Sequence, residues 1–91
     1  MSFEFDPSKG ASNKLKHGID FEAAQALWRD DRRLTVLSDF VGEQRFVVVG
    51  SIEGRLWAAA ATLRGEAVRI ISVRRARPKE EVPYGTQDDQ C

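Results

Sequence analysis

The sequence predicts an α+β fold in which two N-terminal helices pack on a four- to five-stranded, mainly antiparallel sheet. Residues 7–30 contain two segments with helix-capping residues, and the second has the apolar spacing of an amphipathic helix. From Leu34 onward the apolar period changes to two, and turns containing glycine separate four strand-like segments. The chain has 91 residues, which is enough for one domain with a single core.

The N-terminus predicts a short strand followed by a helix. Residues 3–6 alternate apolar and acidic side chains, which is the pattern of an edge strand. The Asp-Pro pair at 6–7 favours a helix start, since Asp is a common N-cap and Pro suits the first helical position. We expect this helix to cover residues 7–17 and to bury Ala11 and Leu15, which are spaced by four.

A second helix is predicted directly after the first. Gly18 ends the first helix in the left-handed conformation that glycine adopts easily, and Asp20 is suited to cap the next one. Apolar side chains recur at residues 21, 24, 27 and 28, and we expect this stripe to pack on the sheet. Trp28 could instead stack on a nucleic-acid base, but a Trp in such a stripe is typical of a core.

Four strands are predicted after the helices. We expect strands over 34–37, 45–49, 55–63 and 68–73, joined by turns at 38–44, 50–54 and 64–66. The four alanines at 58–61 also suit a helix. We predict a strand because this segment lies between two turns, and small side chains on a central strand let helices approach closely.

The last residues break these patterns. Pro78 and Pro83 limit any helix there, and no apolar pattern follows Tyr84. We therefore assign residues 1–77 to one globular domain and expect residues 78–91 to form a short irregular or partly helical tail.

Composition narrows the functional class. No apolar run approaches the roughly 18–20 residues of a membrane span, and residues 1–9 lack the layout of a signal peptide, so we expect a cytoplasmic protein. One cysteine, at position 91, and one histidine argue against a disulfide framework and a zinc site. We expect neither a metal nor a cofactor.

Positive charge is concentrated near the last strand. Between Arg64 and Lys79, six basic residues and one acid give a local charge of +5, although the whole chain has a net charge of zero. Strict alternation places Arg74 and Arg75 on opposite faces at the end of the strand 68–73. An arginine fork matches phosphate oxygens, so this patch suits a short stretch of phosphates or one acidic protein surface.

The chain resembles the BrnT family of bacterial toxins. The residues that carry the resemblance are Phe5-Asp6-Pro7, Lys9, Asn13, Lys16-His17-Gly18-Ile19, Phe21, Ala24, Gly42-Glu43, Arg45, Gly50, Gly54-Arg55, Thr62, Arg64, Arg69-Ile70-Ile71-Ser72 and Arg74-Arg75-Ala76. This resemblance implies a RelE-like fold and a ribonuclease that arrests translation. It also implies a BrnA-type antitoxin, whose ribbon-helix-helix part binds operator DNA, so that the toxin contacts DNA only through its partner. The assemblies that we expect are a hetero-oligomeric toxin–antitoxin complex or a homo-oligomer.

These residues suit RNA cleavage without a metal. A base can activate the 2′-hydroxyl of RNA, cations can stabilise the phosphorane, and an acid can protonate the leaving oxygen. His17 is the first candidate for proton transfer because histidine normally titrates near neutral pH. Its partner could be Lys16, Lys9, Tyr84 or an arginine. The expected catalytic residues are His17, Lys16, Arg64, Arg74 and Arg75, and the expected RNA-binding residues are Lys9, Asn13, Arg69 and Arg77.

Structural roles for the same residues remain open. His17 could simply cap helix carbonyls, and Asn13 could brace a loop. Family members usually continue into a basic C-terminal helix that ends near a Tyr, whereas Glu80, Glu81 and two prolines interrupt that stretch here. This departure favours a second hypothesis, in which the protein is a catalytically degenerate module that binds its antitoxin and contributes to autoregulation.

Overall fold

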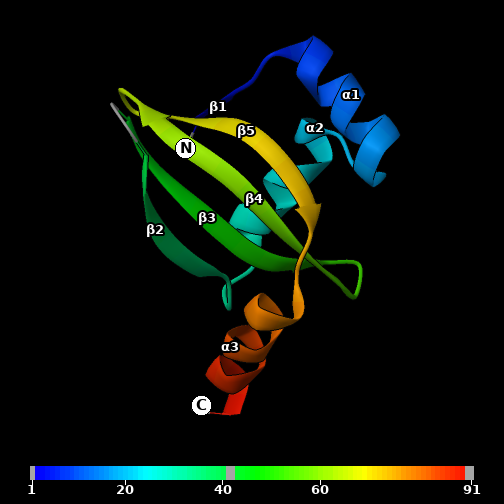
Figure 1. Ribbon diagram of the computed structural model, residues 1–91, viewed down its shortest axis with the longest axis vertical. Helices are drawn as coiled ribbons and strands as arrows, with labels where there is room; N and C mark the ends of the chain where they lie inside the picture. The colour runs from blue at the N-terminus through cyan, green and yellow to red at the C-terminus, as the bar shows by residue number, and fades with distance from the viewer. Residues whose placement is uncertain (1, 41–42, 90–91) are drawn as a thin grey trace.

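Five strands form one mixed sheet in the computed structural model, which describes residues 2–40 and 43–89 (Figure 1). The elements are β1 (Ser2–Glu4), α1 (Pro7–His17), α2 (Phe21–Ala24), the 3-10 helix η1 (Gln25–Arg29), β2 (Leu34–Phe40), β3 (Glu43–Ile52), β4 (Arg55–Arg64), β5 (Ala67–Arg75) and α3 (Pro78–Asp89). The sheet order is β1-β5-β4-β3-β2. Among the described strands, β1 alone runs parallel to its neighbour, so the predicted α+β class and meander are confirmed.

Local capping explains where the helices begin and end. The Asp6 carboxylate accepts hydrogen bonds from the N–H and hydroxyl of Ser8, at 2.9 and 2.8 Å. Gly18 has a φ of 86° and donates its N–H to the carbonyl of Lys14, which closes α1. Asp20 caps α2 by accepting from the N–H of Ala23 at 2.8 Å. The second predicted helix is present, but after Ala24 it tightens into η1.

The buried side of α1 differs from the prediction. Leu15 is 90% exposed and Ala11 is also exposed, whereas Gly10 and Asn13 are buried. A Cβ at Gly10 would lie 3.7 Å from the Phe21 ring, so this helix approaches α2 through its smallest residue. The expected apolar stripe was wrong because α1 docks through a glycine and a hydrogen-bonded amide.

The core lies between the sheet and the two N-terminal helices. Side chains from α2 and η1, including Phe21 and Leu27, meet Val48, Ala59 and Val73 from the three central strands. Ala59 is fully buried, with Val48 and Val73 as its cross-strand neighbours, which explains why alanine suits β4. Trp57 is buried in the same cluster, and Trp28 packs against this cluster, as the core interpretation of Trp28 predicts.

The strands are longer than the sequence pattern predicts, and β5 contains an irregularity. Residues 38–40 and 43–44, expected in a turn, extend β2 and β3, while residues 41–42 of that turn lie outside the described residues. In β5, Ala60 pairs with Ser72 but Ala61 pairs with Ile70. A bulge at Ile71 therefore shifts the alternation, and Arg69 shares a face with Arg74 rather than opposing it.

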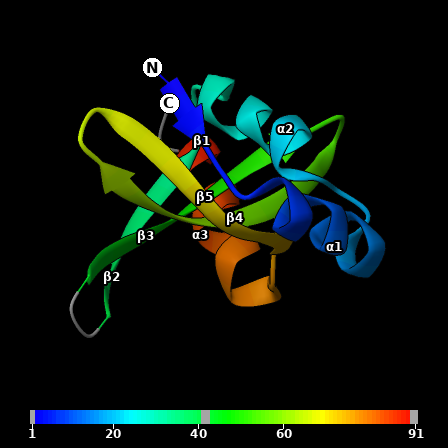
Figure 2. The ribbon, with the colours of Figure 1, turned by 90° about the horizontal axis from the view of Figure 1, so that it is seen from above.

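The C-terminal segment is more regular than expected. Residues 78–89 form α3, which lies beyond the end of β5 and contacts β3 (Figure 1, Figure 2). The helix includes Pro83, which cannot donate a backbone hydrogen bond. Two polar side-chain contacts, Arg74 with Glu80 and Tyr84 with Asp30, attach this helix to the rest of the fold. No helix among the described residues is long and apolar enough to cross a membrane.

Candidate functional site

A row of arginines crosses the face of the sheet opposite α1 and α2. We call this the open face; its residues include Arg45, Thr62, Arg64, Arg69 and Arg74. In the register, Glu4 pairs with Arg69, Arg69 with Thr62, and Thr62 with Arg45. Arg45 in β3 and Arg69 in β5 therefore lie in line on either side of Thr62 in β4. A third arginine, Arg64, lies two residues further along β4.

Glu4 organises one end of this row. Its Oε1 lies 3.6 Å from Nε of Arg64 and 3.5 Å from Nη1 of Arg69. The Arg64 side chain is 61% exposed, so these long, solvated ion pairs stabilise the fold little and leave donors available to a ligand.

Arg64 and Arg74 lie far apart on the open face. The strand partners of Arg69 and Arg74 are Thr62 and Ala58, four residues apart on β4, which corresponds to about 13 Å along the strand. Arg64 lies beyond Thr62, further still from Arg74. The Arg64 and Arg69 side chains are directed to Glu4, and that of Arg74 is directed to Glu80, so the open face has two separate groups of cations.

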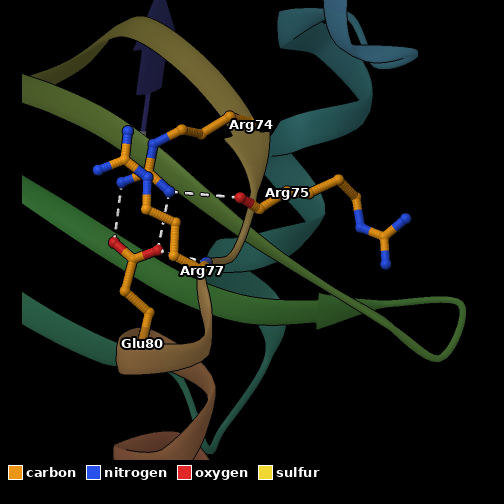
Figure 3. A network of polar contacts seen from close by, with 4 residues as sticks. All are labelled: Arg74, Arg75, Arg77 and Glu80. Atoms are coloured by element: carbon orange, nitrogen blue, oxygen red, sulfur yellow. Dashed lines mark hydrogen bonds and ion pairs between the residues drawn. The ribbon is translucent and has the colours of Figure 1, made fainter.

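The second group contains Arg74, Arg77 and the carboxylate of Glu80 (Figure 3). Nη1 and Nη2 of Arg74 donate to Oε1 and Oε2 of Glu80 at 2.7 and 2.8 Å. The N–H of Arg77 donates to Oε1 at 2.8 Å, so the same carboxylate also caps α3. Hydrogen bonding by Arg74 lowers the pKa of Glu80 to about 2, and the charge of Arg77 contributes in the same direction.

Arg75 belongs to the other face of the sheet. Its side chain points away from Arg74 in Figure 3, and its guanidinium lies 5.4 Å from the centre of the Trp57 ring. Trp57 borders a hollow of about 450 Å³ between the start of α2 and the β3–β4 turn, also lined by Gly18, Ile19 and Arg55. Gly18, which lines this hollow, directly follows His17 in the chain.

The remaining predicted residues lie on α1. Lys9, Lys16 and His17 are exposed, on the side of the molecule that carries the core helices. Asn13 is 7% exposed; its amide donates to the carbonyl of Ile19 at 2.8 Å and accepts from the N–H of Val73 at 3.1 Å. Asn13 thus ties the end of α1 to β5, which is the bracing role that the sequence left open.

The structure therefore divides the predicted site residues into two groups. Arg64, Arg69, Arg74 and Arg77 belong to the open face and its α3 border; Lys9, Lys16, His17 and Arg75 belong to the helix side. The end of β5 lies between α1 and α3 and so adjoins both groups (Figure 1). The sequence did not identify Glu4 and Glu80 as partners, although the spacing of Glu80 three residues after Arg77 is that of a capping box.

A second polar contact attaches α3. The Tyr84 hydroxyl donates to Oδ2 of Asp30 at 2.7 Å, and the same oxygen accepts from the N–H of Ser51 at 2.8 Å. Partial burial acts to raise the pKa of Asp30, but these donors and the N–H of Arg32 outweigh it and hold the pKa below its usual value. Tyr84 therefore acts as an anchor of α3 in this conformation.

Comparison with known proteins identifies the family. Residues 5–80 match the model of a family described as the ribonuclease toxin, BrnT, of type II toxin-antitoxin systems. A comparison with curated protein sequences gives no match. The match spans α1, all four antiparallel strands and the Arg74–Glu80 contact. The chain belongs to the BrnT family of ribonuclease toxins, which act in type II systems together with an antitoxin partner.

Proposed function

We propose that this protein cleaves RNA without a metal ion and thereby inhibits translation, and that a BrnA-type antitoxin with a ribbon-helix-helix part neutralises it. The observation that carries the proposal is the set of arginines on the open face, in a chain of the ribonuclease-toxin family. Guanidinium groups that are held on strands and at least partly exposed, as in Arg64, Arg69 and Arg74, can grip successive phosphates of a single RNA strand.

The chemistry would use the 2′-hydroxyl of the RNA as nucleophile. The 2′-oxygen bonds to the adjacent phosphorus as the bond from phosphorus to the 5′-oxygen breaks, and an arginine beside this phosphate stabilises the charge of the phosphorane. His17 either takes the 2′-hydroxyl proton as the base or protonates the leaving 5′-oxygen as the acid, with Lys16 or Lys9 in the other role. Because His17 and Arg75 lie on the helix side, while Arg74 and Arg77 lie on the open face, the RNA would have to pass around the end of β5 to meet both. Lys16 and Lys9 extend the positive charge along α1, and Arg64 and Arg69 extend it across the sheet.

The division between faces determines the experiment. Labelled RNA is incubated in EDTA with wild-type protein, His17→Ala, Arg74→Ala and Arg75→Ala, each checked for folding by circular dichroism. The two arginines must be substituted separately, since they face opposite sides. We expect His17→Ala to slow cleavage by about 100-fold or more. The arginine variant with the larger loss identifies the face that holds the scissile phosphate. Absence of cleavage by folded wild-type protein, on free RNA and on translating ribosomes, would contradict the proposal.

One observation favours a second function. The Arg74 fork that would hold a phosphate is already paired with Glu80, and the family's basic C-terminal stretch is replaced here by one with Glu80 and Glu81. A toxin-like module that only binds its antitoxin and contributes to autoregulation would tolerate such pairing. This function predicts that the wild-type protein forms the antitoxin complex with operator DNA but leaves RNA intact.

A further inference from the structure

The contact between Arg74 and Glu80 uses only part of the arginine. A guanidinium has five N–H donors in a rigid plane. Nη1 of Arg74 donates to Glu80 and, at 3.3 Å, to the carbonyl of Arg75, while Nη2 gives one hydrogen to Glu80. Among the described residues, Nε and the second hydrogen of Nη2 have no hydrogen-bond partner. These two donors form the other fork of the group, on the edge adjoining the one that Glu80 occupies.

The contact also fixes where this second fork lies. Glu80 holds two nitrogens of Arg74 at once, and the carbonyl of Arg75 holds one of them from another direction, so the guanidinium plane cannot rotate freely. The Glu80 side chain is only 15% exposed, whereas that of Arg74 is 30% exposed. The carboxylate is therefore the more buried partner, and the arginine has the larger share of its surface available to a ligand.

The carboxylate is itself held in place by backbone. Its Oε1 accepts from the N–H of Arg77 at the start of α3, which limits its rotation. The arrangement resembles a ligand-binding arginine oriented by a neighbouring acid, in which the side chain loses less conformational entropy when it binds an anion.

We propose that Glu80 is a positioning residue that orients Arg74 so that its Nε–Nη2 fork binds one phosphodiester of the RNA. This inference rests on the proposed function. It gives a role in RNA binding to Glu80, one of the two acidic residues that distinguish the C-terminal stretch. The alternative is that Glu80 competes with RNA for Arg74, and the two make opposite predictions. A carboxylate near bound RNA repels it, so its removal should tighten binding if charge alone matters. If Glu80 positions Arg74, removal should weaken binding although the protein becomes more positive.

Binding is measured with a 2′-O-methyl RNA oligonucleotide, which lacks the attacking hydroxyl, so that affinity is read without cleavage. We expect Glu80→Ala to weaken binding by at least about fivefold, because a bidentate contact to a charged group loses its geometry. Glu80→Gln keeps a hydrogen-bond acceptor and should lie between Glu80→Ala and wild type. Glu81→Gln is the matched control, since it removes the same charge from an exposed neighbour on α3; its binding should equal that of wild type or be slightly tighter.

A double-mutant cycle separates positioning from damage to α3. In the Arg74→Ala background, Glu80→Ala should cause no further weakening if Glu80 acts through Arg74. Further weakening there, or unchanged or tighter binding by Glu80→Ala alone, would overturn the inference, and tighter binding would identify Glu80 as a competitor of RNA. If wild-type protein binds and cleaves RNA but Glu80→Ala behaves like wild type, only this inference fails. If wild-type protein does not bind the oligonucleotide, the proposed function fails with it.

Discussion

Asn13 shows how one side chain can join α1, the linker that follows it and β5. It bridges the carbonyl of Ile19, just after α1, and the N–H of Val73 in β5, and both contacts are buried. Sequence reasoning placed this residue among the RNA contacts because the family motif contains it. A buried amide with two backbone partners suggests instead that it positions α1, and with it His17, relative to the end of β5.

Replacing Asn13 with alanine should therefore reduce stability more than a change elsewhere on α1. The substitution leaves one carbonyl and one N–H buried without partners, and we expect a loss of about 2–3 kcal/mol in the free energy of unfolding. Urea denaturation measures this value. Ser12→Ala, at an exposed position of the same helix, serves as the control and should change stability by no more than about 0.5 kcal/mol. A similar loss in both variants would indicate that helix propensity, rather than the bridge, determines the effect.

Two carboxylates should make the fold sensitive to acid. The pKa of Glu80, lowered to about 2, and the pKa of Asp30 both lie below their usual values in the folded protein. The unfolded chain therefore takes up protons at a higher pH than the folded protein does. The stability contributed by these groups is fully present above about pH 5 and is lost as the pH falls toward 2.

The Glu80→Gln variant isolates the larger of these effects. At pH 7 we expect it to be less stable than wild type by about 1–2 kcal/mol, a value reduced by the partial exposure of Arg74. The difference should shrink as the pH falls from 5 toward 2.5, because the unfolded wild-type chain takes up a proton at Glu80 in this range, whereas the unfolded variant has no carboxylate to protonate at this position. Urea unfolding at several pH values tests this, and Glu81→Gln should retain the pH dependence of wild type.

At the scale of elements, β4 depends on small side chains facing the helices. Ala59 has no exposed surface and lies between Val48 and Val73, whereas Ala60 is half-buried on the opposite face. Ala59→Leu should destabilise the protein by about 1–3 kcal/mol, because the added methylenes have no space. Ala60→Val should be nearly neutral, since valine suits a strand. Thermal or urea unfolding of both variants checks this; equal effects would mean that close packing on the helix side does not require alanine.

The elements that could be predicted from sequence are those specified locally. Asp6 and Asp20 mark the helix starts by their own hydrogen bonds, and the period-2 segments mark four strands. The bulge at Ile71 could not be predicted, because β-branched residues occur on both faces of β5. The regularity of α3 was equally hidden, since its anchors, Glu80 to Arg74 and Tyr84 to Asp30, depend on contacts formed only in the folded chain.

For the whole molecule, the same reasoning explains what could be known of the site. The residue types and the basic patch were visible in the sequence, but their distribution was not, because a one-residue bulge decides which arginines share a face. The folded chain places Arg64, Arg69 and Arg74 on the open face and Arg75 with Trp57 on the other. An antitoxin that covers the open face would compete with RNA for the same guanidinium groups.

The salt dependence of RNA binding should show that the open face carries the phosphate contacts. Each contact between a basic side chain and a phosphate of single-stranded RNA contributes about 0.7 to the slope of log affinity against log salt concentration. Arg64→Ala and Arg69→Ala should each weaken binding of the 2′-O-methyl oligonucleotide and reduce this slope by about that amount.

The control for this experiment is Arg29→Ala, which removes an exposed arginine of η1, outside the open face. It changes the net charge equally, so only a general electrostatic attraction would give it the same effect. If the slope falls for Arg64→Ala and Arg69→Ala but not for Arg29→Ala, the RNA follows the strands of the open face. Equal changes in all three variants would show that the sheet provides only a diffuse field, and the search for the RNA path would then move to α1 and the hollow beside Trp57.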